Sequence, residues 1–330
     1  MPRHIVICFH DFPIGGTERV AIDLARRWVA LGWRVTILCG TEAGPQRALV
    51  DPSVAVVSLD PPLPRNPISR FTLARRMAQR LPALAPDVVF LPGNFHLVLA
   101  PVLAKAVPRA VIVGKISNPP APAGLIGAPV RWVLRRILPS LSGAAAMNSG
   151  LAAEVAALAP TIAVRTLYDP IAVNPSAASH PTPPEGPAEV LWAGRFEPQK
   201  DVPLALAVAQ QLARRRPVHL TMLGGGAGLE RARAEVARRG LAQAITLAGH
   251  VPTIDPWLAK ARALLVTSRY EGGPAVAVEA LAHGVPVVST DCSHFLRDVM
   301  TAPEAGRIVA TRDPAALAEA LTAVLDAPAP

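Results

Sequence analysis

Short apolar runs alternate along the chain with longer stretches in which apolar residues recur at helical spacing. Residues 4–9 form the first such run, as expected for a parallel strand that is buried on both faces. Residues 17–31 then place apolar side chains on one helical face, and Gly32 ends that pattern. A second apolar run at residues 33–38 completes a strand–loop–helix–strand unit.

The same alternation continues to the end of the chain. In the first half, strands are expected at 54–59, 87–91, 110–116 and 144–148, and helices at 68–80, 95–105, 128–141 and 150–158. In the second half, strands are expected at 189–193, 218–223, 245–247, 263–268 and 285–290, and helices at 203–215, 228–240, 254–260, 274–283 and 315–325. Such alternation is typical of doubly wound parallel sheets.

Residues 170–187 (PIAVNPSAASHPTPPEGP) separate the two sets and form the most loop-like stretch of the chain. A length of 330 residues corresponds to roughly two domains. We therefore predict an α/β protein with two Rossmann-like domains that face each other across a cleft. The N-terminal domain is expected at residues 1–170, a linker at 171–187 and the C-terminal domain at 188–330.

Composition excludes several classes of protein. Hydrophobic residues make up 51% and charged residues 17% of the chain, so disorder is excluded. Cys8, Cys39 and Cys292 lie far apart and have neither metal-binding nor disulfide-framework spacing, which fits a reducing, cytoplasmic location. The N-terminus lacks the layout of a signal peptide, and no apolar run is long enough to span a bilayer.

The excess of positive charge is confined to the first part of the chain. Residues 1–180 carry 18 lysines and arginines against nine acidic residues, whereas residues 181–330 carry 15 of each. Such an excess fits a nucleic acid, an anionic lipid or a phosphorylated substrate as partner, and it fits a solvated basic surface equally well. Nucleic acid has the least support, because no helix-turn-helix, zinc spacing or RNP-like aromatic pattern occurs.

The densest group of candidate functional residues follows the strand predicted at residues 263–268. Glu271 lies at the carboxyl end of that strand, where ligands bind in open α/β sheets. Gly272 and Gly273 allow backbone N–H groups to approach an anion at the start of the next helix, and Pro274 suits the first turn of that helix.

Glu279 lies further along the same helix, within an otherwise apolar run. A carboxylate there is costly unless it is hydrogen-bonded, so we expect Glu279 to bind a ligand that carries donors. The alternative is that Glu271 is a helix-terminal glutamate and Glu279 faces solvent.

Two further loops are candidates for binding phosphate. Arg195 and Lys200 share the loop after residues 189–193, and Lys200 is one of only four lysines in the chain. A solvated surface loop is the alternative for this pair. Gly15 and Gly16 precede a predicted helix N-terminus, where backbone N–H groups meet phosphate. No GxGxxG or GxxxxGKS/T pattern occurs, so dinucleotide and P-loop sites are not indicated.

Six motifs, taken in order, resemble those of the retaining glycosyltransferases of GT-B fold known as group 1 or family 4. They are GGTER at 15–19, LYDPI at 167–171, AGRF with QKD at 193–201, LGGG at 223–226, LAGH at 247–250, and residues 268–291. The last contains the family's E-x7-E pattern as Glu271 and Glu279, and continues from Glu279 as EALAHGVPVV. The resemblance covers nearly the whole chain.

This resemblance implies a role for each residue of the C-terminal motifs. Arg195 and Lys200 would neutralise the diphosphate of a nucleotide-sugar donor, both on binding and as the diphosphate leaves. Glu271 would bind hydroxyls of the donor sugar, helped by the backbone at Gly272–Pro274, and Glu279 would accept hydrogen bonds from the ribose.

The same resemblance implies that Gly15 and Gly16 lie on the phosphates and that His250 and Val251 edge the base. It also implies that no metal or other cofactor is needed, because cationic side chains and a helix N-terminus stand in for a divalent ion. The sugar would be transferred with retention at its anomeric carbon, and the leaving phosphate would help to deprotonate the acceptor.

The chain departs from the family pattern at the end of a strand in the N-terminal domain. Ser117 stands where many relatives carry a histidine, whereas Asn118 matches, and we place both on the acceptor side. His96 lies in a predicted helix, does not align with that histidine and is expected to be structural. Asp169 replaces a more usual asparagine, and Cys292 is expected to be a buried, neutral thiol.

Residues 130–141 predict an amphipathic helix that is flanked by Arg131, Arg135 and Arg136. This pattern is typical of a helix in a membrane interface, and a core-facing helix is the alternative. The resemblance implies that the N-terminal domain holds the acceptor. A lipid-linked acceptor at the inner leaflet would explain why the excess charge lies there.

We therefore expect a glycosyltransferase that moves a sugar from a nucleotide-diphosphate donor to a glycan or lipid-linked acceptor, as in cell-surface or exopolysaccharide synthesis. The protein would be cytoplasmic, with peripheral contact with the inner face of the plasma membrane. The alternatives are a nucleotide-sugar epimerase or phosphorylase on the same fold, and a catalytically impaired sugar-nucleotide-binding partner. The absent histidine favours the second alternative, whereas the intact Arg195, Lys200, Glu271 and Glu279 disfavour it.

Overall fold

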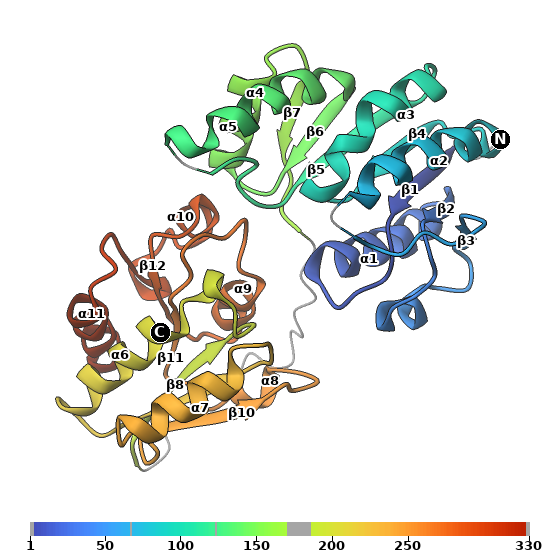
Figure 1. Cartoon of the computed structure of the whole chain (residues 1–330). Helices are drawn as coiled ribbons and strands as arrows, with labels where there is room; N and C mark the ends of the chain where they lie inside the picture. The colour runs from blue at the N-terminus through green and yellow to red at the C-terminus, as the bar shows by residue number, and fades with distance from the viewer. Residues whose placement is uncertain (1–2, 67, 123, 170–185, 328–330) are drawn as a thin grey trace. The chain divides into compact units, whose positions relative to one another are not determined.

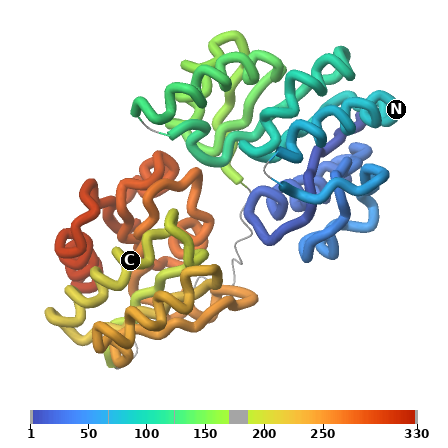
Figure 2. Tube along the Cα trace, in the orientation of Figure 1, coloured from blue at the N-terminus to red at the C-terminus, as the bar shows by residue number. Residues whose placement is uncertain are grey.

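The computed structural model of the chain describes residues 3–66, 68–122, 124–169 and 186–327. It divides into two compact units, Met1–Pro170 and Ile171–Pro330, which Figure 1 shows as labelled helices and strands and Figure 2 as a trace. The linker predicted at residues 171–187 lies outside the described residues except for its last two.

The N-terminal unit is built on a sheet of seven strands, all of whose pairings are parallel, in the order β3-β2-β1-β4-β5-β6-β7. The strands are β1 (His4–Phe9), β2 (Arg34–Cys39), β3 (Ala55–Ser58), β4 (Val88–Leu91), β5 (Val111–Ile116), β6 (Gly143–Ala146) and β7 (Ala163–Thr166). The helices are α1 (Gly16–Ala30), α2 (Ser69–Leu84), α3 (Ala100–Ala106), α4 (Ala128–Ile137) and α5 (Ser149–Leu158).

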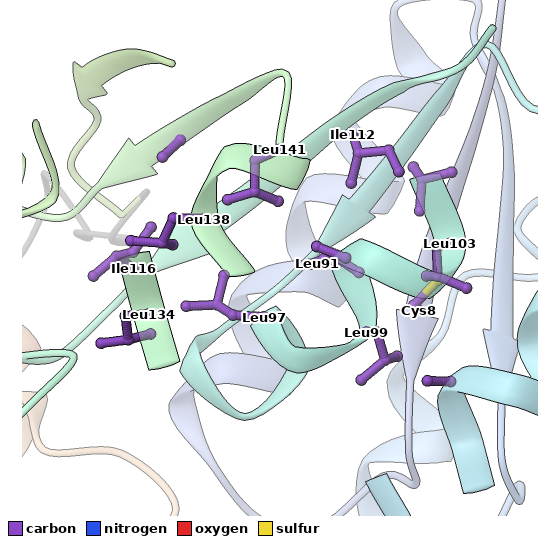
Figure 3. Packing of buried hydrophobic residues seen from close by; sticks show 14 of the residues in the cluster. Cys8, Leu91, Leu97, Leu99, Leu103, Ile112, Ile116, Leu134, Leu138 and Leu141 are labelled. Carbon is purple, nitrogen blue, oxygen red and sulfur yellow. The ribbon is translucent and has the colours of Figure 1, made fainter. Parts of the chain in front are cut away.

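Successive residues of β1 enter two different cores, which is why the strand is apolar on both faces. Val6 and Cys8 pack in a large cluster with side chains from α2, α3, α4 and α5. Figure 3 shows part of this cluster, with Cys8 near Leu103 and with Leu138 beside Ile116. Ile5, Ile7 and Phe9 pack instead in a cluster with side chains of α1. The sheet is therefore covered by helices on both faces.

The C-terminal unit is built on a sheet of six strands, all of whose pairings are parallel, in the order β10-β9-β8-β11-β12-β13. The strands are β8 (Ala188–Ala193), β9 (Val218–Leu223), β10 (Ile245–Gly249), β11 (Ala263–Val266), β12 (Val287–Thr290) and β13 (Gly306–Val309). The helices are α6 (Val202–Ala213), α7 (Leu229–Arg238), α8 (Asp255–Leu258), α9 (Ala275–Ala282), α10 (His294–Val299) and α11 (Pro314–Asp326).

The residues of β8 alternate between two cores in the same way. Val190 and Trp192 pack with side chains of α6, α7 and α11, whereas Leu191 packs with side chains of α8, α9 and α10. Each unit is thus a three-layer, doubly wound α/β structure, and the predicted pair of Rossmann-like domains is confirmed.

Besides 3-10 turns, the described residues form three elements, two strands and one α-helix, that the sequence pattern did not predict. Two of them, β7 and β13, are four-residue strands at the edges of their sheets, and their residues are half-buried or exposed. An edge strand has neighbours on one side only and therefore lacks the continuous apolar run of a central strand. The third is the short helix α10, which Ser293 begins as N-cap.

Two predicted helices are wrong in part, because each contains a 3-10 segment. The helix expected at 95–105 begins as a 3-10 helix at Asn94–Leu99 and becomes α-helical only in α3. The helix expected at 128–141 ends its α-helical part at Ile137 and continues as a 3-10 turn, Leu138–Ser140, which contains Pro139. Among the described residues, no helix is both long enough and apolar enough to cross a bilayer.

Candidate functional site

The strand order of the C-terminal unit reverses between β8 and β11, which lie side by side with Leu191 opposite Leu264. Ligands of open α/β sheets bind outside the carboxyl ends of the strands at such a switch point. Two loops meet there: residues 194–201 after β8 and residues 267–274 after β11. They carry Lys200 and Glu271, which lie 71 residues apart in the sequence.

Lys200 and Glu271 form the ion pair at the centre of this site. The Nζ atom of Lys200 donates to Oε1 of Glu271 at 2.6 Å, and the hydroxyl of Ser268 donates to the same oxygen at 2.7 Å. Gln199 Nε2 donates to Oε2 at 3.4 Å. Glu271 is buried and Lys200 is half-buried, so the pair is only partly screened by water. The structure thus brings together two residues that the sequence analysis assigned to the donor.

The two loops are joined by further hydrogen bonds. The backbone N–H of Arg269 donates to the carbonyl of Gln199 at 2.7 Å, and the hydroxyl of Thr267 donates to the carbonyl of Lys200 at 2.8 Å. Trp192 Nε1, in the core below, donates to that same hydroxyl at 3.0 Å. The position of Lys200 is therefore set by backbone contacts as well as by its own ammonium group.

Arg312, which precedes α11, also joins the two loops, and the sequence analysis missed it. Its guanidinium donates to Oδ2 of Asp201 at 2.5 Å and to the carbonyls of Thr267 and Ser268 at 2.9 and 2.8 Å. Asp201 is buried at a left-handed φ of 48° and caps the N-terminus of α6. No local signal marks Arg312, because its partners lie 44 to 111 residues away.

Arg195 lies in the loop after β8 but does not join the pair in this structure. Its side chain is 58% exposed, and Nη1 donates to Oε1 of Glu197 at 3.0 Å. An exposed pair of this kind is weak, so the guanidinium is available to a ligand.

The loop that contains Glu271 is held by hydrogen bonds to residues that follow strand β12. The backbone N–H of Glu271 donates to the carbonyl of Cys292 at 2.8 Å, and the hydroxyl of Ser293 donates to the carbonyl of Gly272 at 2.9 Å. Burial raises the pKa of the Cys292 thiol, so it is neutral. Gly273 and Pro274 then lead into α9, with Pro274 as N-cap.

A cavity of about 220 Å³ lies beside helix α9; it is lined by residues 251–255 together with Glu279 and His283, and we call it the Glu279 cavity. It brings together Val251 and Glu279, two of the residues assigned to the nucleoside. His250 is exposed and does not belong to the lining. Burial, aided by the charge of Asp255, raises the pKa of the Glu279 carboxyl above its ordinary value.

In the N-terminal unit, Gly15 and Gly16 begin α1 as predicted for a phosphate-binding turn. Gly15 is the N-cap and has no side chain to offer, and Gln46 Nε2 donates to its carbonyl at 2.9 Å. Glu18, in the first turn, is buried, and burial raises the pKa of its carboxyl. Arg65 Nη2 lies 3.5 Å from Oε1 of Glu18, so a basic group is already close to this helix end.

Ser117 and Asn118 follow β5, and a second buried ion pair holds them. Lys115 Nζ lies 2.8 Å from Oδ1 of Asp169 and donates to the hydroxyl oxygen of Ser117 at 3.0 Å. Asn94 accepts from the backbone N–H of Ser117 at 3.0 Å and donates to the carbonyl of Asn118 at 2.9 Å. The Ser117 oxygen accepts from an ammonium group, so its own proton is directed elsewhere.

His96 lies in the 3-10 helix before α3 and is fully buried. Burial lowers its pKa to about 3, so the ring is neutral, and neither ring nitrogen has a hydrogen-bond partner. Among the described residues, no group of three or more His, Cys, Asp or Glu side chains is arranged to hold a metal ion.

Comparison with known protein families decides the identity of the chain. A family model described as Glycosyltransferase Family 4 matches residues 14–168, and one described as Glycosyl transferases group 1 matches residues 187–327. The chain belongs to the group 1 / family 4 glycosyltransferases. The resemblance read from the six motifs is therefore confirmed.

Curated relatives of this family member match over part of its length. A glycogen synthase of Mycobacterium tuberculosis is 32% identical over 202 residues, which are 60% of this chain and 48% of the relative. A lipopolysaccharide 1,6-galactosyltransferase of Salmonella typhimurium is 27% identical over 164 residues, which are 47% of this chain and 44% of the relative. The chain thus spans about half the length of the curated relatives it matches.

Solved structures show the same fold over nearly the whole chain. The lipopolysaccharide outer core galactosyltransferase WaaB aligns with a TM-score of 0.73 at 20% identity, covering 98% of this chain and 90% of that one. The structure of TarM aligns with a TM-score of 0.80 at 11% identity, covering 99% and 92%. These likenesses establish the two-domain α/β fold of GT-B type that the sequence analysis expected.

Proposed function

We propose that this protein is a retaining glycosyltransferase that moves a sugar from a nucleotide-diphosphate donor to a glycan or lipid-linked acceptor in cell-surface polysaccharide synthesis. Family membership supports the reaction type. Curated relatives named for glycogen and lipopolysaccharide synthesis support glycans as products. Two structural neighbours, TarM and HepE, have been solved in complex with UDP, which supports a nucleotide-diphosphate donor.

The observation that carries this proposal is the Lys200–Glu271 pair at the switch point of the C-terminal sheet. A buried carboxylate beside a cation offers an acceptor for sugar hydroxyls next to a charge for phosphate. When a diphosphate binds, Lys200 shares its three donors between Glu271 and the phosphate oxygens. Arg195 turns from its weak pair with Glu197 and supplies the second cation.

These cations would act mainly as the bond between the sugar and the diphosphate of the donor breaks. Negative charge grows on the leaving diphosphate in the transition state, and fixed positive groups stabilise that charge more than they stabilise the bound donor. In this way Lys200 and Arg195 take the place of a divalent cation. The leaving phosphate then accepts the proton of the acceptor hydroxyl on the same face of the sugar, which accounts for retention.

The nucleoside half of the donor is assigned to the Glu279 cavity. Glu279 accepts from the ribose, Val251 and His250 border the base, and the backbone at Gly272–Pro274 assists Glu271 at the sugar. The raised pKa of Glu279 supports this assignment, because the carboxyl is short of donors until a ligand brings them.

The N-terminal unit is assigned to the acceptor. Ser117, whose proton is free to donate, and Asn118 are the proposed contacts with acceptor hydroxyls. Gly15 and Gly16 are assigned to phosphate through the N-terminus of α1.

We also propose that the N-terminal unit rests on an anionic membrane. Leu125 and Ile126, just before α4, are 90% and 84% exposed, and Trp132 on α4 is 56% exposed. Arg135 and Arg136 lie on the same helix and are exposed. Exposed apolar side chains beside arginines are what an interfacial segment presents to anionic lipid.

Substitution of Lys200 tests the donor site. Lys200→Ala should weaken the binding of a nucleoside diphosphate at least tenfold and leave the binding of the nucleoside nearly unchanged, because only the phosphates meet the ammonium group. Calorimetry with UDP, GDP and ADP, and with the matching nucleosides, measures both quantities. Lys260→Ala, at an exposed lysine outside the site, is the control. Equal losses for the diphosphate and the nucleoside would refute the phosphate role.

A further inference from the structure

The Glu279 cavity contains hydrogen-bond acceptors that lack donors. No hydrogen bond to the Glu279 carboxylate occurs among the described residues. The second carboxylate in the lining, Asp255, accepts from the Thr253 hydroxyl through Oδ2 at 3.0 Å. Glu279 is half-buried, so its carboxylate is partly shielded from water and gains from a ligand that brings donors, whereas the Asp255 side chain is 45% exposed and reaches water.

His283 adds a third acceptor, and its ring is fixed in one orientation. The residue is 3% exposed, and Nδ1 lies 2.8 Å from the carbonyl oxygen of Glu279. A carbonyl oxygen only accepts, so Nδ1 carries the proton and donates. In the neutral ring Nε2 is then an acceptor; it has no hydrogen-bond partner and lies 3.5 Å from Oδ1 of Asp255.

The chemistry of this lining selects the kind of group that fits. Two carboxylates make the cavity negative, so a phosphate is excluded by repulsion. A cavity of about 220 Å³ is several times larger than the ~30 Å³ that one water occupies in the liquid. A neutral group with adjacent hydroxyl donors satisfies the acceptors, and the vicinal diol of a ribose is such a group.

We propose that His283 is a second ribose-binding residue, whose Nε2 accepts from one hydroxyl of the diol while Glu279 accepts from the other. Asp255 borders the pair and keeps the phosphate half of the ligand out. This inference rests on the proposed function, and it adds a specificity-determining residue to the nucleoside site.

The test compares ribose and deoxyribose ligands on two variants. His283→Asn keeps a donor near the position of Nδ1 and removes the acceptor at Nε2. His219→Asn, at a half-buried histidine at the start of β9, is the matched control. The probe is whichever of UDP, GDP and ADP binds the wild type most tightly, together with its 2′-deoxy and 3′-deoxy forms.

His283→Asn should weaken the binding of the ribose ligand about fivefold, which corresponds to the loss of one neutral hydrogen bond. The same substitution should have no effect on one of the two deoxy forms, because the hydroxyl that His283 accepts from is already missing. Equal losses for the ribose form and both deoxy forms would overturn the proposal, and so would wild-type affinity of the variant for all three.

A measurement on the wild type keeps the proposal falsifiable if His283→Asn fails to fold. Both deoxy forms should bind more weakly than the ribose form, since each hydroxyl has its own acceptor. If only one deoxy form is weakened, His283 has no hydroxyl partner and the inference is wrong. Glu279→Gln separates this result from the proposed function, because unchanged ribose binding in that variant would overturn the nucleoside site as a whole.

Discussion

Glu279 illustrates how a residue that we propose to bind a ligand can lower the stability of the fold. It lies in the apolar helix α9, and burial raises the pKa of its carboxyl. The unfolded chain therefore releases this proton at a lower pH than the folded chain does. The protonated Glu279 carboxyl therefore favours the folded state at acid pH. This contribution to stability is lost as the pH rises from the pKa in the unfolded chain, about 4.3 for a glutamate, through the higher pKa in the folded chain.

Glu279→Gln should therefore make the protein more stable at neutral pH. The gain should shrink toward pH ~4, where the carboxyl is protonated in both the folded and the unfolded state. Thermal unfolding of the variant and the wild type at the two pH values measures the difference. The same variant should bind nucleotide more weakly. A variant less stable than the wild type at neutral pH would contradict the assigned cause of the pKa shift.

Arg312 is a second single residue with a large expected effect, because it holds two loops together by hydrogen bonds. Arg312→Ala removes three hydrogen bonds, one of them to the buried Asp201 carboxylate, and should lower the free energy of unfolding by about 2 kcal/mol. Urea denaturation measures this loss. Arg307→Ala, on the exposed side of β13, should change it by less than about 0.5 kcal/mol. A loss of the same size in both variants would show that Arg312 does not hold the loops.

Individual residues of the site were predictable where a motif marks them and not otherwise. Lys200, Glu271 and Glu279 stand in motifs that can be read along the chain. Arg312 stands in no motif, and His283 lies within the EALAHGVPVV stretch without any sign there of a binding role, because the partners of both residues depend on the fold.

At the scale of elements, buried strands and long helices were predictable because each has a face that must be apolar. The edge strand β7, with residues that are half-buried or exposed, carries no such pattern and was missed. The segment at residues 130–141 was predicted as one apolar face, but the structure divides it. Leu134, Leu138 and Leu141 are buried, whereas Val130 and Val133 are exposed. The core-facing alternative therefore describes the buried part of this helix, and the contact with a membrane stays a proposal.

This division predicts opposite results for two leucines near α4. Leu138→Ala, in the core, should lower the free energy of unfolding by about 2–5 kcal/mol, because a cavity replaces packed side chain. Leu125→Ala, 90% exposed, should change it by less than about 0.5 kcal/mol. Urea denaturation of both variants checks the contrast. A large loss for Leu125→Ala would mean that its side chain is packed in the folded protein.

At the scale of the whole molecule, the excess positive charge lies in the first part of the chain. The part of the chain with balanced charge carries the residues that we propose to bind the donor. The net charge of +9 comes from the first 180 residues, where the exposed apolar residues near α4 also lie. This coincidence supports our proposal that the first part of the chain contacts anionic lipid and not nucleic acid.

The protein should therefore bind phosphatidylglycerol vesicles at low salt and leave them at about 1 M salt, where the Debye length falls to about 3 Å. Arg135→Glu should weaken this binding, because it reverses a charge beside the apolar side chains. Arg231→Glu, at an exposed position on α7, is the matched control. Vesicle sedimentation measures the bound fraction. No binding of the wild type at low salt would remove the membrane contact.

The sequence by itself determined the alternation of strands and helices, the two α/β domains and the family, because burial patterns and motifs are local along the chain. Only the tertiary structure decided which residues meet. Strand order places β8 beside β11, and that placement brings Lys200 to Glu271 across 71 residues. The tertiary structure also decided that Nε2 of His283 has no hydrogen-bond partner, because that depends on every residue packed around the atom.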